Sequence, residues 1–255
     1  MEKKRLLGTG ISIGEYDKFT SDIIEFARKR EGKYVCVANV HMIIEAYNDP
    51  EFSSIINNAL IVTPDGQPLS LLLKILYGVK QPRVAGMDLL PDLLKLVEEE
   101  KIPVFFYGSA SATLDKVKAK LKSQYPEVVL AGVISPPFGD ISPALLKSHI
   151  DLINRSETGI IFVVLGCPKQ EKLMAEMSGR VNGVMIGVGG AVPVFAGELS
   201  RAPEWMQKYS LEWLFRLVKE PGRLWKRYLF TNTKFIFLAL REVFLRKILK
   251  KQDSV

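Results

Sequence analysis

The sequence is poor in the residues that build disulfides and metal sites. Its 255 residues include only two cysteines and two histidines, and no two aspartates are spaced D-x-D. Cys36 and Cys167 lie in apolar surroundings without a pairing pattern, so we expect reduced thiols and a cytosolic protein. A zinc site built from several histidines is not expected either. The sequence therefore predicts no metal site and no cofactor.

Long hydrophobic runs are also missing where a membrane anchor would need them. In the aromatic C-terminal part the longest apolar run is Phe235–Leu240, and a spanning helix needs ~20 apolar residues. No apolar segment follows the basic residues 1–5, so a secretory signal is not expected. The G-x-G-x-x-G pattern is absent, because Val192 stands where the last glycine would be, and there is no P-loop pattern. These absences disfavour membrane-spanning proteins, NAD enzymes and P-loop enzymes.

Excess positive charge is confined to the last fifth of the chain. Residues 201–255 hold 13 Lys+Arg and 5 Asp+Glu, a net charge of +8, and all three tryptophans. The preceding 200 residues hold 22 and 23, a net charge of −1. A basic, aromatic segment is typical of a helix that lies on an anionic membrane. The alternatives are a helix packed on the body with a solvated basic face, and nucleic-acid binding, for which no motif is present.

Short apolar runs alternate with helix-like segments along the body. This order predicts an α/β fold with a Rossmann-like parallel sheet flanked by helices, followed by a helical, membrane-binding appendage. We place the catalytic domain at residues 1–200 and the appendage at residues 201–255. The predicted strands are Tyr34–Ala38, Ile102–Tyr107, Val128–Ile134, Ile160–Leu165 and Val184–Val188. The predicted helices are Asp17–Arg30, Asp88–Glu100, Ser111–Tyr125, Pro143–Asn154 and Pro168–Ser178.

Three predicted strands end in loops that contain glycine. Glycine lets a backbone approach a ligand closely, and helix N-termini offer free N–H groups to phosphate. Any doubly wound fold needs glycine at its turns, so each loop alone says little, whereas three in succession favour a nucleotide-type ligand. The candidate binding residues in these loops are Gly108, Ser109, Gln170, Gly187, Gly189 and Gly190.

A carboxylate is the expected acid–base group, because no Ser-His-Asp set is apparent. Asp65 lies in the segment Val62–Pro68, where Pro-Asp-Gly is a common turn. The alternative is a carboxylate fixed at a strand end beside apolar walls, where desolvation raises its proton affinity.

Several segments together resemble the WecG/TagA/CpsF family of bacterial glycosyltransferases (glycosyltransferase family 26). The resemblance covers nearly the whole chain in order. It implies a metal-independent, inverting transfer of a sugar from a UDP-sugar to a polyprenyl-diphosphate-linked sugar at the cytoplasmic face of the membrane. The products of the family feed teichoic acid, common antigen, capsule or exopolysaccharide. The segments are Thr63–Gly66, Arg83–Asp88, Leu165–Glu171, Gly187–Gly190, Arg201–Pro203, Leu211–Arg216 and Lys219–Pro221.

The resemblance also implies roles for individual residues. Asp65 corresponds to the general base, and Gln170 lines the active site. Four arginines are expected to meet phosphate groups, in place of a metal, as charge develops on the leaving UDP. They are Arg83, Arg216, Arg223 and Arg227. Thr63 is expected to bind substrate, and Asn39 is expected either to bind the donor or to cap the helix that follows it.

Two further expectations concern the identity of the donor sugar and the oligomeric state of the protein. The segment Val37–Met42 is similar to the exopolysaccharide branch, which includes hexose-transferring members, so the donor is expected to carry a hexose or N-acetylmannosamine. A sugar-nucleotide-modifying enzyme and a non-catalytic sugar-nucleotide-binding protein at the membrane are the alternatives. A homo-oligomer is expected in the absence of a membrane, because an apolar face would be exposed.

Overall fold

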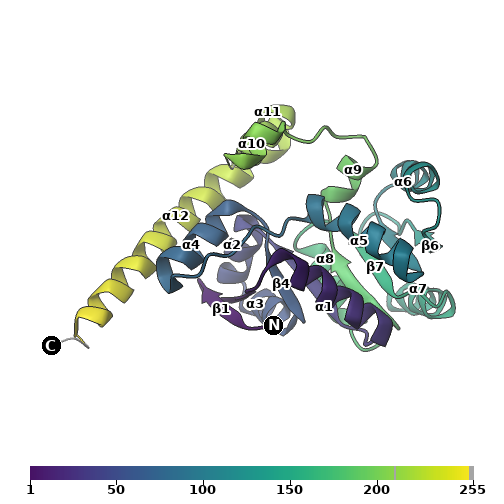
Figure 1. Ribbon diagram of the computed structural model, residues 1–255, viewed down its shortest axis with the longest axis horizontal. Coiled ribbons are helices and arrows are strands. Elements are labelled where there is room, and N and C mark those ends of the chain that lie inside the picture. Colours follow the sequence, from purple (N-terminus) through teal and green to yellow (C-terminus); the bar gives the residue numbers. More distant parts are fainter. Residues whose placement is uncertain (210, 253–255) are drawn as a thin grey trace.

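A six-stranded, fully parallel sheet forms the centre of the computed structural model (Figure 1). The structure describes residues 1–209 and 211–252, with their side chains except those of residues 208, 223, 247 and 249–252. An antiparallel hairpin precedes the sheet in the chain, formed by β1 (Lys3–Leu6) and β2 (Thr9–Ser12). In spatial order the parallel strands are β4 (Ile61–Pro64), β3 (Tyr34–Ala38), β8 (Val184–Gly187), β7 (Ile160–Val164), β5 (Val104–Gly108) and β6 (Leu130–Ile134).

Helices cover both faces of the sheet, and successive side chains of a strand enter two different cores. On β3, Val35 and Val37 belong to one core, whereas Cys36 and Ala38 belong to the other. Strands buried on both faces are apolar throughout, which is why they appear as continuous runs in the sequence. The first core is closed by α1 (Tyr16–Lys29), α5 (Gly86–Glu100), α6 (Ser111–Gln124) and α9 (Ala191–Phe195). The second is closed by α2 (Val40–Asn48), α3 (Pro50–Asn58), α4 (Gln67–Tyr77), α7 (Pro143–Arg155) and α8 (Lys169–Met177).

This architecture confirms the predicted α/β fold with a parallel sheet flanked by helices. The five predicted strands are present, and their ends differ from the prediction by at most two residues. The hairpin, β4 and helices α2–α4 lie outside the predicted elements. β4 escapes a pattern-based prediction because its apolar residues give way to Thr63 and Pro64 after Val62.

The C-terminal segment forms three helices, α10 (Glu204–Lys208), α11 (Glu212–Lys219) and α12 (Pro221–Gln252). One stripe of the 32-residue α12 packs against α2 and α4 and buries Phe235 and Leu238 in the second core. The division of the chain into two domains at residue 200 stays a prediction.

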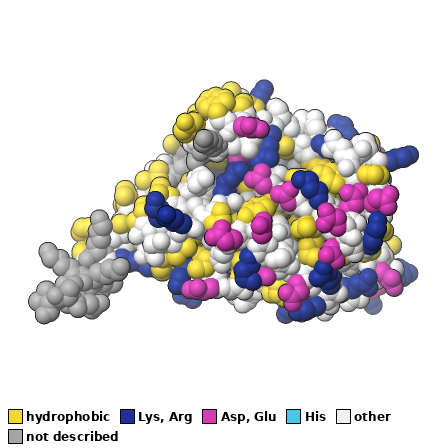
Figure 2. Space-filling view, in the orientation of Figure 1, with side chains coloured by type: hydrophobic (Ala, Val, Ile, Leu, Met, Phe, Trp, Pro, Cys, Tyr) yellow, Lys and Arg dark blue, Asp and Glu magenta, His cyan; other side chains and the backbone are white. Residues whose placement is uncertain are grey.

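The opposite side of α12 carries large apolar side chains that face solvent. Phe230, Phe237, Leu240 and Phe244 are each more than 60% exposed. Figure 2 shows hydrophobic side chains gathered over α10 and α11 and along α12. None of the helices in the described ranges combines the length and the apolarity that crossing a bilayer would require. α12 therefore packs on the body through one stripe and exposes a second one.

Candidate active site

Most of the predicted site residues gather at the carboxyl edge of four adjacent strands. Asp65 follows β4, Asn39 follows β3, the loop Gly187–Gly190 follows β8, and Gln170 lies just beyond β7 at the start of α8. The carboxyl ends of parallel strands share one edge, where α/β folds bind their ligands. The structure thus brings together residues that are more than 100 positions apart in the sequence.

Asp65 is fixed at the end of β4 by its own backbone. Its amide N–H donates a hydrogen bond of 2.7 Å to the carbonyl oxygen of Ala38 at the end of β3. Burial raises the pKa of the Asp65 carboxyl to about 7. The guanidinium groups of Arg83 and Arg216 lower this pKa and the carboxylate of Glu212 raises it, so desolvation has the largest effect. A carboxyl that titrates near neutrality suits a general base.

Thr63 and Asn39 have local partners within the protein. Thr63 is fully buried, and its hydroxyl donates to the carbonyl oxygen of Val84 at 3.0 Å. Asn39 is the N-cap of α2, where its Oδ1 accepts a hydrogen bond of 3.2 Å from the amide of Met42. Of the two roles expected for Asn39, donor binding and helix capping, the structure therefore contains the capping contact. The roles of both residues toward a substrate stay predictions.

The side chain of Gln170 occupies the space over two glycines of the β8 loop. Its Oε1 accepts a hydrogen bond of 3.0 Å from the amide of Gly166. A Cβ at Gly187 would lie 2.8 Å from Gln170 Nε2, and a Cβ at Gly189 would lie 3.0 Å from Gln170 Oε1. Larger residues at these two positions would displace the amide. The side chain of Gln170 therefore requires glycine at these two positions, in addition to the predicted close approach of a ligand.

Arg216 of α11 reaches the same loop from the C-terminal segment. A Cβ at Gly190 would lie 2.5 Å from Arg216 Nη2, so the guanidinium group rests directly on this glycine. The positive charge of Arg216 also lowers the pKa of the Asp65 carboxyl. The C-terminal helices thus contribute a cation to the edge of the sheet where Asp65 lies.

The other two predicted arginines of this segment lie on α12. Burial and the nearby charge of Arg227 lower the pKa of His41 to about 4, so Arg227 lies close to the start of α2. Arg223 belongs to α12, but its side chain lies outside the described residues.

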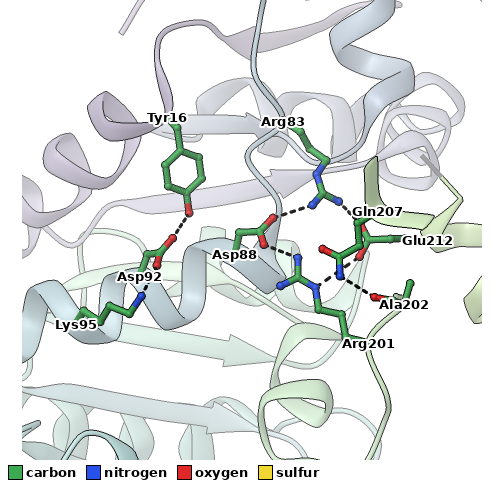
Figure 3. A network of polar contacts seen from close by, with 9 residues as sticks. All are labelled: Tyr16, Arg83, Asp88, Asp92, Lys95, Arg201, Ala202, Gln207 and Glu212. Atoms are coloured by element: carbon green, nitrogen blue, oxygen red, sulfur yellow. Dashed lines mark hydrogen bonds and ion pairs between the residues drawn. The ribbon is translucent and has the colours of Figure 1, made fainter. Parts of the chain in front are cut away.

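Arg83 belongs to a network of ion pairs between the body and the C-terminal segment (Figure 3). Its guanidinium group contacts Asp88 of α5 at 2.8 Å and also Glu212 of α11. Arg201 contacts the same Asp88, and its Nε lies 3.8 Å from Glu212. Two arginines therefore alternate with two carboxylates. The network fixes Glu212 at the start of α11, and Arg216 follows one helical turn later. Asp88, Arg201 and Glu212 had no predicted role, although the segments that carry the family resemblance include all three.

Gly108 is the last residue of β5 and Ser109 follows it, farther along the edge of the sheet. At ~4.8 Å between strands, four steps separate β5 from β4, or roughly 19 Å of sheet. Gly108 has a φ of +105°, and a Cβ there would lie 2.5 Å from the carbonyl oxygen of Val164. This glycine is therefore required by the neighbouring strand. The structure does not bring Gly108 and Ser109 next to Asp65, and their binding roles stay predictions.

The described residues contain no cluster of three or more His, Cys, Asp or Glu side chains that could hold a metal ion. The cations at the site are arginines, which bind phosphate oxygens in pairs. The metal independence implied by the resemblance stays a prediction.

Comparison with known proteins gives matches over almost the whole chain. The family model described as "Glycosyl transferase WecG/TagA/CpsF family" matches residues 4–248. An N-acetylglucosaminyldiphosphoundecaprenol N-acetyl-beta-D-mannosaminyltransferase of Bacillus subtilis (strain 168) is 30% identical over 212 residues, which cover 83% of this chain and 80% of the relative. A protein of the same name from Bacillus spizizenii is 30% identical over 238 residues, which cover 90% of each chain.

Proposed function

Since the chain belongs to the WecG/TagA/CpsF family of glycosyltransferases, we propose that it transfers a sugar from a UDP-sugar to a polyprenyl-diphosphate-linked saccharide. N-acetylmannosamine is the first choice of donor sugar, because the names of two relatives specify its transfer to N-acetylglucosaminyldiphosphoundecaprenol. A hexose is the second choice, from the similarity of residues 37–42 to the exopolysaccharide branch. The reaction belongs to the biosynthesis of a bacterial cell-surface polysaccharide.

The observation that carries this proposal is the position of Asp65 at the carboxyl edge of the sheet, which Arg216 reaches over Gly190. Asp65 takes the proton of the acceptor hydroxyl while that oxygen forms a bond to the anomeric carbon. The bond between the anomeric carbon and the diphosphate oxygen breaks on the opposite face, so the configuration inverts and UDP leaves with the bonding electrons. Arg216, together with Arg227 and Arg83, stabilises the negative charge that UDP gains in the transition state.

Membrane association is the second part of the proposal. The exposed stripe of α12 forms an apolar surface together with the exposed aromatic side chains of α10, of the residue that ends it and of α11, which are Trp205, Tyr209 and Trp213. Many lysines and arginines lie in the same segment. Such a surface inserts shallowly into a membrane while its cations meet anionic headgroups. On this proposal the protein works at the cytoplasmic face of the membrane, because the resemblance implies a lipid-linked acceptor there.

Vesicle binding tests this surface. The protein is expected to co-sediment with phosphatidylglycerol-containing vesicles, and less so at high salt, because salt screens the headgroup attraction. The double variant Phe237→Ser/Phe244→Ser is expected to bind at least ~10-fold more weakly, since each buried aromatic side chain contributes ~1.5–3 kcal/mol. The control Val129→Ser/Leu152→Ser removes exposed apolar side chains elsewhere on the body. Equal binding by all three proteins would contradict the proposal.

The activity itself is tested by UDP release. Purified protein is given a short-chain polyprenyl-diphosphate-N-acetylglucosamine or -glucose acceptor and each of several UDP-sugars, with and without EDTA. Turnover of UDP-N-acetylmannosamine that survives EDTA is the expected result. Turnover of a UDP-hexose alone would reassign the donor, and loss of turnover in EDTA would exclude the metal-independent mechanism. Binding of UDP-sugars without turnover of any would instead favour the non-catalytic alternative.

Sedimentation velocity without a membrane checks the predicted self-association.

A further inference from the structure

Glu171 is a buried carboxyl group for which the proposed mechanism has no use. It lies in the first turn of α8 and is completely inaccessible to solvent. The geometry gives its Oε2 no hydrogen-bond partner within the described part of the chain, although the Cys167 thiol and the backbone N–H of Glu171 lie near enough to the carboxyl to lower its pKa. Burial raises its pKa to about 7. An apolar side chain would avoid the cost of desolvating a carboxylate at this position, so the group calls for an explanation other than stability.

The other oxygen of Glu171 has one well-defined contact. Oε1 accepts a hydrogen bond of 2.7 Å from Nε2 of Gln170. At the opposite end of the same amide, Oε1 of Gln170 accepts from the backbone N–H of Gly166. A flipped amide would place two oxygens against each other at Glu171 and two N–H groups against each other at Gly166. Glu171 and Gly166 therefore fix which end of the amide is nitrogen.

The fixed amide lies where the donor is proposed to bind. Gln170 Nε2 lies over Gly187, and Gln170 Oε1 lies over Gly189. The next residue, Gly190, is covered by Arg216, whose charge also acts on Asp65. The amide nitrogen carries two hydrogens, of which Glu171 accepts one. The second is suited to an acceptor oxygen of a bound sugar nucleotide.

We propose that Glu171 is a positioning residue for the transfer reaction: it holds the Gln170 amide over the glycine loop with one N–H left for a hydroxyl or phosphate oxygen of the donor. This inference rests on the proposed glycosyltransferase function. Glu171 touches no reacting atom, and it acts only through Gln170.

The test is a double-mutant cycle with a conservative rescue. Glu171→Met removes the acceptor and is expected to lower kcat by about 10- to 100-fold, because a misplaced binding group costs about that much. Glu171→Gln keeps an oxygen at the position of Oε1 and is expected to restore most of the loss. In the Gln170→Ala background, Glu171→Met is expected to cost no more than about threefold further, since its partner is already gone. Glu176→Met removes an exposed charge from the same helix and serves as the control.

A structural readout separates this inference from the proposed function. The side-chain ¹H–¹⁵N amide resonances of Gln170 are expected to move in Glu171→Met and to stay near their native positions in Glu176→Met. Unmoved resonances, or a loss of kcat in Glu171→Met that is just as large in the Gln170→Ala background, would overturn the positioning role. If the wild-type protein turns over no donor, the proposed function fails, and the resonances still decide whether Glu171 orients the amide.

Discussion

Replacing Asp65 with asparagine is expected to lower kcat for sugar transfer by about 10²- to 10⁴-fold, the usual contribution of a general base. Asparagine has nearly the same shape but cannot accept the proton of the attacking hydroxyl. The affinity for UDP is expected to change little, because the arginines that meet the diphosphate remain. Initial rates of UDP release and a UDP titration by calorimetry measure the two quantities.

The pH profile gives this prediction a second readout. The pKa of Asp65 is about 7, so the carboxyl is protonated and inactive as a base at lower pH. The rate is therefore expected to rise with pH through about 7 in the wild-type protein, and the residual rate of Asp65→Asn is expected to lack this rise.

The stability of the protein is expected to fall as the pH rises, whereas the reaction rate rises. A carboxyl whose pKa is raised by folding binds its proton more tightly in the native state, so the protein loses stability as the pH rises from about 4 through 7. Asp65→Asn removes this loss and is expected to raise Tm at pH 8 more than at pH 4.

The control for Asp65 is an aspartate with no proposed role. Asp151 lies exposed on α7, and Asp151→Asn removes one exposed carboxylate from a helix that carries none of the candidate site residues. Its kcat is expected to equal that of the wild type. If Asp65→Asn also kept the wild-type kcat, Asp65 would be only a turn residue and the base would have to be another group.

Arg216→Ala is expected to have the second largest effect, a loss of about 10²- to 10³-fold in kcat/KM. This is the usual cost of removing one group that stabilises charge in a transition state. Arg216→Lys is expected to recover only part of the loss, because an ammonium group cannot bind two phosphate oxygens as the planar guanidinium does. Steady-state kinetics with a water-soluble acceptor measures the effect without a contribution from membrane binding.

The same variant is expected to shift the pH profile. The positive charge of Arg216 lowers the pKa of Asp65. Without that charge the carboxyl holds its proton to higher pH, so the rising limb of the profile moves upward. Lys219→Ala removes a positive charge from an exposed position on the same helix and is the matched control. Equal kinetics for Arg216→Ala and Lys219→Ala would exclude a role for Arg216 in the reaction.

The sequence by itself determined the fold class and the position of the candidate base. Central strands of a parallel sheet are buried on both faces, so β3, β5, β7 and β8 appear as apolar runs that need no tertiary information. The edge strand β6 is only half-buried. Asp65 could be located because Pro-Asp-Gly marks a turn and because its segment resembles a known family. β4 was not predicted, and it is defined by its pairing with β3 and by the burial of Ile61 and Val62 in the two cores.

The tertiary structure decided the surroundings of these residues. The contact between Arg83 and Glu212 joins positions 129 residues apart, and no local pattern predicts such a pair. The glycines at 187, 189 and 190 are covered by Gln170 and Arg216, whereas the sequence alone suggested glycines needed either for tight turns or for close approach of a ligand. The pKa values of Asp65 and Glu171 are raised because packing removes water from both carboxyls. Desolvation and charge proximity depend on residues that are distant in the chain, so they arise only when the chain has folded.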